Sequence, residues 1–209
     1  MEIRNTNGLK ALAFDLGRVL FDFDYNIALN KIKDKMSVSG EEVIQALFYE
    51  NFADDFERGL VSGYDFYSHF KEKTSLNLDY RSFVPVWCDI FTLKEDSFSL
   101  LKSLSAIYKT FLISNINELH YQFLKKRYPQ VFSLFEAEIL SFQVKYTKPA
   151  RQIYDILISK AGVNKEELVY IDDRADLIEE ANRQGLNCIQ FTDVEQCKKE
   201  LLSFGCRFS

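Results

Sequence analysis

The chain has 209 residues, which is the size of one large domain or of one domain carrying a smaller insertion. Hydrophobic residues make up 47% of it and aromatic residues 15%, so it can bury a substantial core, and a disordered, collagen-like or coiled-coil protein is excluded. The 26 basic and 31 acidic residues give a net charge of −5 without any basic block, which argues against nucleic-acid or anionic-membrane partners and favours a small ligand.

The cysteines and the N-terminus indicate the compartment. No two cysteines form a CxxC pair, so the sequence indicates neither a zinc site nor a disulfide framework. We expect reduced thiols at Cys88, Cys188, Cys197 and Cys206. Residues 1–10 are polar, and Asp15 interrupts the apolar run that follows, so neither a secretory signal nor a membrane span is predicted. A cytoplasmic location is therefore expected.

The first predicted element is a strand at residues 11–14, a short and continuous apolar run. Between residues 24 and 93 no convincing strand follows, but helical patterns occur that turn-forming residues separate. Helices are expected in this stretch at residues 29–36, 41–50, 64–73 and 83–91. The stretch is therefore predicted to be a helical module inserted after the first strand.

Strands and helices alternate in the rest of the chain. Apolar runs predict strands at residues 110–113, 168–171 and 187–191. Amphipathic periodicity predicts helices at residues 98–107, 118–127, 150–161, 175–184 and 194–202. Strands that are apolar throughout and alternate with helices are typical of a sheet covered on both faces. The expected fold class is α/β, with a doubly wound, Rossmann-like parallel sheet.

Polar residues follow the predicted strands at the edge where a parallel sheet binds its ligands. These residues are Asp15 after the first strand, Ser114 and Asn115 after the second, and Asp172 and Asp173 after the third. Lys148, followed by Pro149, opens the helix that precedes the third strand. One nucleophile, one hydroxyl, one ammonium group and an acidic pair would then meet at one edge of the sheet.

This set of side chains matches phosphoryl transfer through a covalent intermediate. A carboxylate such as Asp15 can attack phosphorus, and Mg²⁺ would screen its repulsion from the phosphate dianion. Asp15, a backbone carbonyl and Asp173 offer the hard oxygen ligands that Mg²⁺ prefers. Ser114 and the amides of a helix beginning near Asn115 would hold the phosphate oxygens. Lys148 would neutralise charge on the nucleophile and on the phosphate.

Four motifs give the chain a resemblance to the haloacid dehalogenase (HAD) superfamily. They are FDLGRVL at residues 14–20, LISN at 112–115, Lys148-Pro149, and YIDD at 170–173. The string SNINELH at residues 114–120, together with FDFD at 21–24, is similar to the subgroup that includes bacterial α-glucose-1-phosphate phosphatases. The resemblance implies a core of residues 1–21 and 94–209. It also implies that residues 22–93 form a small helical cap that closes over the site and selects the substrate.

The resemblance implies roles for individual residues as well. Asp15 would be the nucleophile, and the backbone carbonyl of Gly17 would be a metal ligand. Asp173 is the acidic metal ligand of the family pattern, with Asp172 as a further candidate. Residues 57–62 (ERGLVS) resemble a loop that such caps present to the site, and they equally fit an ordinary glycine turn between helices.

Gly17 departs from the usual motif of HAD phosphatases, which carry a second aspartate at this position. That aspartate protonates the leaving oxygen and later activates water, a contribution of about 10²–10⁴-fold in rate. The subgroup named above also tends to have glycine here, so inactivity does not follow. Asp22, Asp24 or His120, the last expected to be a partly exposed helix residue, could substitute. Gly17→Asp is expected to raise turnover mainly on alkyl phosphates.

Three functions remain open at this point. The leading one is a Mg²⁺-dependent phosphatase that acts on a small phosphorylated metabolite, such as a sugar phosphate, through an aspartyl phosphate on Asp15. The second is a metal-independent 2-haloacid dehalogenase, which the acidic pair Asp172–Asp173 disfavours. The third is a catalytically weak or inactive phosphate-binding or regulatory module, which Gly17 keeps open. The sequence leaves the oligomeric state undetermined.

Overall fold

A five-stranded parallel sheet organises the chain in the computed structural model, which describes residues 8–39, 42–43 and 52–208. The strand order is β5-β4-β1-β6-β7, and every neighbouring pair is parallel. The strands are β1 (Ala11–Phe14), β4 (Lys109–Ser114), β5 (Ala137–Leu140), β6 (Leu168–Asp172) and β7 (Asn187–Gln190). The predicted α/β fold class with a doubly wound parallel sheet is confirmed.

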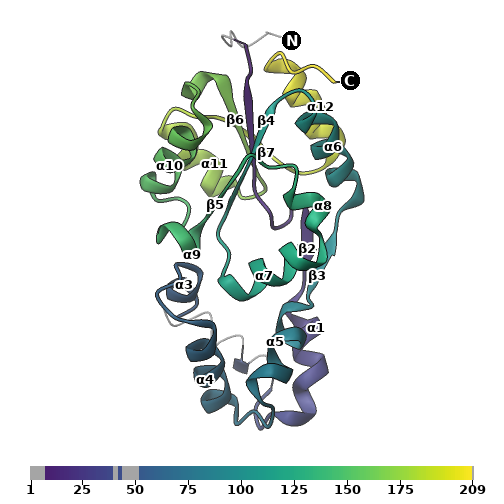
Figure 1. Cartoon of the computed structure of the whole chain (residues 1–209), viewed down its shortest axis with the longest axis vertical. Helices are drawn as coiled ribbons and strands as arrows, with labels where there is room; N and C mark the ends of the chain where they lie inside the picture. Colours follow the sequence, from purple (N-terminus) through teal and green to yellow (C-terminus); the bar gives the residue numbers. More distant parts are fainter. Residues whose placement is uncertain (1–7, 40–41, 44–51, 209) are drawn as a thin grey trace.

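Helices cover both faces of the sheet (Figure 1). Leu12 and Phe14 of β1 belong to one hydrophobic cluster, and Ala11 and Ala13 belong to another, because successive side chains of a strand point to opposite faces. The first cluster includes residues of α6 (Glu95–Ser105), α7 (Glu118–Arg127), α8 (Pro129–Phe132) and α12 (Val194–Ser203). The second includes residues of α10 (Arg151–Ala161) and α11 (Ala175–Arg183). Burial on both faces explains why the central strand β1 is apolar throughout.

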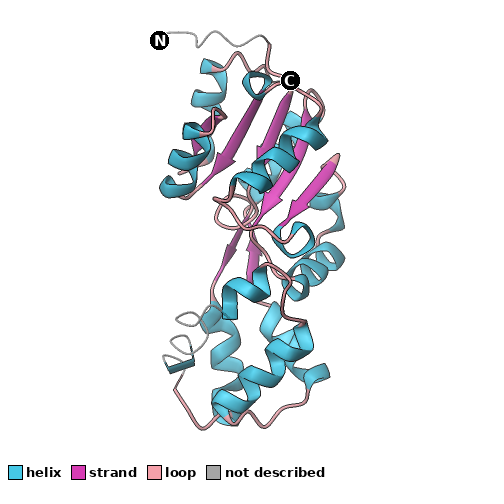
Figure 2. Cartoon of the chain, turned by 90° about the vertical axis from the view of Figure 1, so that its left-hand side faces the viewer, coloured by secondary structure: helices cyan, strands magenta, loops and turns pink. Residues whose placement is uncertain are grey.

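Two short antiparallel strands, β2 (Phe21–Phe23) and β3 (Phe91–Leu93), connect the sheet to a group of helices. Residues 24–90, between these strands, are called the helical insert below. The helices given with their bounds in its described part are α1 (Tyr25–Ile32), the 3₁₀ turn η1 (Lys33–Lys35), α3 (Phe52–Glu57), α4 (Gly63–Thr74) and α5 (Tyr80–Cys88). Figure 2 shows the sheet and the helical insert at opposite ends of the long axis.

The helical insert has a hydrophobic cluster of its own. Trp87 is buried at its centre, with ring centroids 5.2 Å from Phe70 and 5.5 Å from Phe83. Leu119 and Phe123 of α7 pack against this cluster from the side of the sheet. The helical insert therefore rests on α7, close to the carboxyl ends of the strands.

The structure corrects several predicted elements of the insert. The stretch from residue 24 to residue 93, expected to lack strands, ends in β3, and the helix expected at residues 83–91 stops at Cys88. The helix expected at 29–36 is α1 followed by η1, and α3 was not predicted. The helix expected at 64–73 is present as α4. The helix expected at residues 41–50 lies largely outside the described residues.

Elsewhere the predicted strands lie within or about one residue beyond β1, β4, β6 and β7, and the predicted helices overlap α6, α7, α10, α11 and α12. The edge strand β5 was missed because Glu138 interrupts its apolar residues, so no continuous apolar run marks it. The short helix α9 (Ser141–Val144) and the turn η2 (Lys165–Glu167) were also missed. Among the described residues, no helix is both long and apolar enough to span a membrane.

Candidate active site

Polar side chains meet at the carboxyl edge of the sheet, because β1 lies between β4 and β6. Asp15 directly follows β1, Ser114 ends β4, and Asp172 ends β6. The amide of Asp15 donates a 2.9 Å hydrogen bond to the carbonyl of Ile171, which extends the strand pairing to the nucleophile candidate. Strand ends of this kind form the ligand site of open α/β sheets.

Lys148 lies at the centre of this group with only 4% of its surface exposed. Its Nζ donates hydrogen bonds to Asp15 Oδ1 at 2.7 Å, to Asp172 Oδ2 at 2.6 Å and to the carbonyl of Ile113 at 3.3 Å. All three ammonium protons thus have partners. Burial lowers the pKa of Lys148, but the charges of Asp15 and Asp172 outweigh this effect and hold the pKa above its usual range. The ammonium therefore stays charged at neutral pH.

The three carboxylates of the site differ in their surroundings. Burial raises the pKa of Asp15 to about 6, although the charge of Lys148 opposes this shift. Asp172 is fully buried, and its Oδ2 accepts hydrogen bonds from Lys148 and the Tyr170 hydroxyl. Its Oδ1 accepts from the amide of Arg174 at 2.9 Å. Asp173 is partly exposed, and burial followed by the charge of Asp172 raises its pKa.

The side chain of Asn115 forms hydrogen bonds with both the backbone amide and the backbone carbonyl of Lys148. Its Oδ1 accepts a 2.7 Å hydrogen bond from the amide of Lys148, and its Nδ2 donates a 3.0 Å bond to the carbonyl of the same residue. The helix after β4 begins at Glu118, as its periodicity predicted, and not as early as Asn115, because the side chain of Asn117 caps it by accepting from the amide of His120 at 3.0 Å. Likewise α10 begins at Arg151, beyond the Lys148-Pro149 pair.

A cleft of about 200 Å³ opens above these side chains. Six of the seven residues predicted for the site line it, namely Asp15, Gly17, Ser114, Asn115, Lys148 and Asp173. Asp172, the seventh, is buried against Lys148. Carboxylate oxygens of Asp15, Asp172 and Asp173 lie within 4.8 Å of one another. Three hard anionic oxygens at this spacing suit a divalent cation such as Mg²⁺.

The cleft also contains residues to which the sequence analysis gave no place in the site, among them Arg18, Phe23 and Arg174. Phe23 lies against Gly17: a Cβ at position 17 would be 3.1 Å from the ring. The guanidinium of Arg18 stacks 4.4 Å from the centre of the same ring. Glu57, at the end of α3, is a further lining residue, and the only sequence signal for it was the resemblance of residues 57–62 to a loop presented to the site.

The three residues considered as substitutes for the missing carboxyl do not line the described cleft. Asp22 pairs with Arg18 at 3.6 Å, and Asp24 caps α1. His120 was expected to be partly exposed, and this is wrong: the rings of Tyr25, Trp87 and Phe91 surround it, and 3% of its surface is exposed. Burial lowers the pKa of His120 to about 4, so it is neutral at physiological pH.

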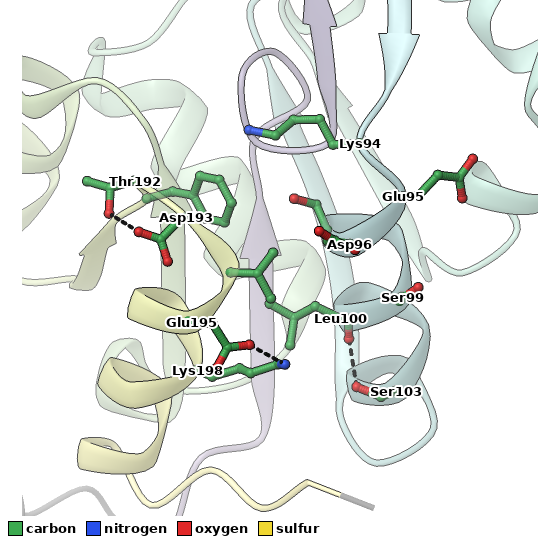
Figure 3. A pocket seen from close by; sticks show the side chains of 13 residues that line it. Lys94, Glu95, Asp96, Ser99, Leu100, Ser103, Thr192, Asp193, Glu195 and Lys198 are labelled. Atoms are coloured by element: carbon green, nitrogen blue, oxygen red, sulfur yellow. Dashed lines mark hydrogen bonds and ion pairs between the residues drawn. The ribbon is translucent and has the colours of Figure 1, made fainter.

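A larger cavity of about 610 Å³ lies between the N-terminal ends of α6 and α12 (Figure 3). Polar groups along its lining are engaged elsewhere, as Lys94 Nζ is by the carbonyl of Arg18 at 2.7 Å. Asp193 caps α12 by accepting from the amide of Gln196 at 2.9 Å, and Glu195 pairs with Lys198 at 2.8 Å. Because these groups do not converge on one point, the smaller cleft around Asp15 is the better candidate site.

Known proteins resemble the chain over most of its length. A model of the haloacid dehalogenase-like hydrolase family matches residues 9–185. A D-ribitol-5-phosphate phosphatase of Bacteroides thetaiotaomicron is 21% identical over 200 residues, which covers 92% of this chain and 97% of the relative.

Solved structures share the fold. A haloacid dehalogenase family enzyme from Bacteroides thetaiotaomicron, in complex with magnesium and inorganic phosphate, has a TM-score of 0.76 at 23% identity and covers 88% of this chain and 95% of that chain. The L-2-haloacid dehalogenase from Xanthobacter autotrophicus has a TM-score of 0.62 at 20% identity and covers 93% of this chain and 83% of that chain.

Proposed function

Because the chain belongs to the haloacid dehalogenase-like hydrolase family, we propose that it is a Mg²⁺-dependent phosphatase of a small phosphorylated metabolite, such as a sugar or polyol phosphate. The observation that carries the proposal is the buried Lys148 ammonium, which joins Asp15 to Asp172 beside a cleft that Asp173 lines. The resemblance to a D-ribitol-5-phosphate phosphatase supports a polyol or sugar phosphate as substrate.

Mg²⁺ fits the donor set at the cleft. We assign Asp15, Asp173 and the carbonyl of Gly17 as its protein ligands. Asp173 is preferred to Asp172 because both oxygens of Asp172 already accept hydrogen bonds from the protein. When bound, the cation would screen the repulsion between Asp15 and a phosphate dianion and stabilise charge on the transferring oxygens.

Side chains of the protein carry out the attack on phosphorus, balance charge and bind the phosphate. The Asp15 carboxylate attacks phosphorus and forms an aspartyl phosphate as the alcohol leaves, and water then cleaves that intermediate. Lys148 holds Asp15 Oδ1 in place and balances negative charge, while Asn115 fixes the backbone of Lys148. Ser114, at the end of β4, donates a hydrogen bond to a phosphate oxygen. We further propose that residues 22–93 act as the cap over a core of residues 1–21 and 94–209.

The alternatives are weaker on specific grounds. A haloacid dehalogenase needs no metal and would leave Asp173 in the cleft without a task. A phosphate-binding module without turnover is supported only by the lack of a carboxyl group at position 17, and activity assays decide this point. Membership of the α-glucose-1-phosphate phosphatase subgroup, a cytoplasmic location and the absence of nucleic-acid partners stay predictions.

Phosphate release tests the proposal. The substrates are p-nitrophenyl phosphate, D-ribitol 5-phosphate and α-glucose 1-phosphate, each with Mg²⁺ or with a chelator. We expect Mg²⁺-dependent release that Asp15→Asn lowers by about 10³-fold or more, since the variant has lost its nucleophile. Asp155→Asn is the control, because Asp155 is exposed on α10. A wild type that releases phosphate from none of the three substrates contradicts the proposal and favours the binding module.

A further inference from the structure

The cleft holds a carboxyl group to which the proposed function gives no task. Glu57 ends α3 of the helical insert and lines the same cleft as Asp15 and Gly17. It also lines a second, small cavity inside the insert, together with Tyr25 and Trp87. Glu57 therefore lies where the cleft meets the interior of the helical insert.

This position is where the leaving group of a phosphate ester would sit. The nucleophile and the leaving oxygen are roughly in line across phosphorus, and Asp15 attacks from the sheet. The leaving oxygen therefore faces the opposite side of the cleft, which the helical insert provides. Position 17 cannot supply a proton there, because it has no side chain and the Phe23 ring fills the adjacent space.

We propose that Glu57 is the general acid and base of this phosphatase and takes the place of the carboxyl that Gly17 lacks. The inference rests on the proposed phosphatase function. As Asp15 bonds to phosphorus, the bond from phosphorus to the alcohol oxygen breaks, and the proton of the Glu57 carboxyl moves to that oxygen. Water then attacks phosphorus, the bond to Asp15 breaks, and the proton of the water returns to Glu57. The net reaction is ester plus water to alcohol plus phosphate.

Contacts with the sheet-side helix α9 fix the backbone that carries Glu57. The hydroxyl of Ser141, which is fully buried, donates a 2.6 Å hydrogen bond to the carbonyl of Glu57 and accepts a 2.9 Å bond from the amide of Ile116. Two residues later, the carbonyl of Gly59 accepts a 2.7 Å bond from Lys145 Nζ. A residue from the insert is thus positioned by groups of the sheet-bearing part of the chain.

Gly59 allows the segment at the end of α3 to approach α9 closely. Its φ of +64° is a conformation that side chains disfavour, and a Cβ there would collide with the carbonyl oxygen of Phe142. The stretch ERGLVS is therefore more than a turn between two helices, since its glycine permits close contact with α9. The contact holds Glu57 against the cleft, and the next residue, Arg58, donates a 3.4 Å hydrogen bond from Nε to the carbonyl of Lys145.

The electrostatic surroundings of Glu57 suit proton transfer in both directions. Burial and then the charge of Asp54 raise its pKa to about 7, while Lys148 and Arg174 oppose the shift and Asp15 adds to it. Glu57 keeps partial exposure to solvent, as a group in an open cleft does. A carboxyl whose pKa lies near the working pH can both give and take a proton efficiently.

The test compares two leaving groups in the full chain with Mg²⁺. p-Nitrophenolate leaves without a proton, whereas the alkoxide of D-ribitol 5-phosphate needs one. Glu57→Gln is expected to lower kcat/KM for D-ribitol 5-phosphate by about 10²–10⁴-fold and to leave kcat/KM for p-nitrophenyl phosphate within a few-fold of wild type. Asp55→Asn, which removes a carboxyl from the same helix outside the cleft, is expected to change neither value.

A burst experiment adds a second readout. Glu57→Gln with p-nitrophenyl phosphate should release about one p-nitrophenolate per enzyme rapidly and then turn over slowly, because the base that activates water is lost. Equal losses of kcat/KM for the two substrates would assign Glu57 to binding or structure and overturn the inference. Unchanged values for both would overturn it too. If wild type hydrolyses neither substrate, the proposed function itself fails, and this inference fails with it.

Discussion

At the scale of single residues, burial decides what an ion pair contributes. Lys148 and Lys10 both contact a carboxylate oxygen at 2.6 Å, from Asp172 and Glu167 respectively. Both members of the Lys148–Asp172 pair are buried, with 2% and 0% of their side chains exposed, whereas in the other pair Glu167 is 9% exposed but Lys10 is 59% exposed and keeps its ammonium group in solvent. Exposed pairs contribute about 1 kcal/mol or less, but removing one member of a buried pair leaves a charge without a partner.

We therefore predict that Lys148→Met lowers the free energy of unfolding by about 3–5 kcal/mol, since Asp15 and Asp172 lose their shared cation. Lys10→Met is the matched control and should cost less than about 1 kcal/mol. Urea unfolding followed by circular dichroism measures both. Similar losses in the two variants would show that the buried arrangement adds no stability.

Several residues of the candidate site could be predicted from the sequence because strand ends of a parallel sheet share an edge. Asp15, Ser114 and Asp172 were placed together for this reason, and the structure brings them to one edge. Glu57 could not be placed by this argument, because it reaches the cleft from another layer of the molecule through its contact with Ser141. The burial of His120 likewise depends on rings of the helical insert.

The gain in turnover on alkyl phosphates expected from Gly17→Asp stays a prediction, and the structure shows what this gain requires. A side chain at position 17 would crowd the ring of Phe23. That ring is held between neighbours, with Arg18 stacked on it and Phe91 at 5.9 Å. The new carboxyl can reach the cleft only if Phe23 moves aside.

At the scale of elements, the contact between α3 and α9 joins the helical insert to the sheet. It depends on one glycine, because any side chain at position 59 would press against Phe142 and Lys145. Gly162, the C-cap of α10, has nearly the same φ of +63° but open space around its Cβ position. Comparing alanine substitutions at the two glycines therefore separates the free-energy cost of the backbone conformation from the cost of losing the contact between α3 and α9.

Gly59→Ala and Gly162→Ala should each lose about 1–3 kcal/mol of stability from the strained backbone. Only Gly59→Ala should also push α3 away from α9 and displace Glu57. We expect it to lower kcat/KM for D-ribitol 5-phosphate by about tenfold or more, with a smaller effect on p-nitrophenyl phosphate. Unaltered leaving-group preference in Gly59→Ala would mean that the contact does not position Glu57.

The elements that could be predicted are those with a long, regular hydrophobic pattern. The apolar runs of β1, β4 and β6 stand out because both faces of these strands are buried, so apolar residues follow one another without alternation. β2 and β3 have three residues each, so they carry too few positions for any period. They form because they pair with each other across the insert, a contact between residues far apart in the sequence.

At the scale of the whole molecule, the hydrophobic interior consists of separate clusters, two on the faces of the sheet and one in the helical insert. Trp87 and Cys88 belong to the cluster of the helical insert, whereas Cys197 belongs to a cluster on the sheet. The insert cluster contacts the rest of the molecule through β2–β3 and α7, and α3 adds its contact with α9. Regions with fewer connections open at lower free energy.

Thiol labelling tests whether these parts unfold separately. All four cysteines are buried and free, so native protein should not react with N-ethylmaleimide. With rising urea, Cys88 should be labelled at lower concentrations than Cys197, which peptide mass spectrometry can resolve. Simultaneous labelling of both cysteines would show one cooperative unit and would argue against dividing the chain into a core and a cap.

The central position of β1 also affects how the protein is made. Both neighbours of this strand, β4 and β6, come later in the chain, and Asp173 follows β6. A growing polypeptide on the ribosome therefore carries Asp15 on a strand with two open edges until β4 has emerged, and with one open edge until residues 168–172 have emerged. The proposed site is complete only after Asp173 has been synthesised, and a shortened product that stops before β6 would lack it.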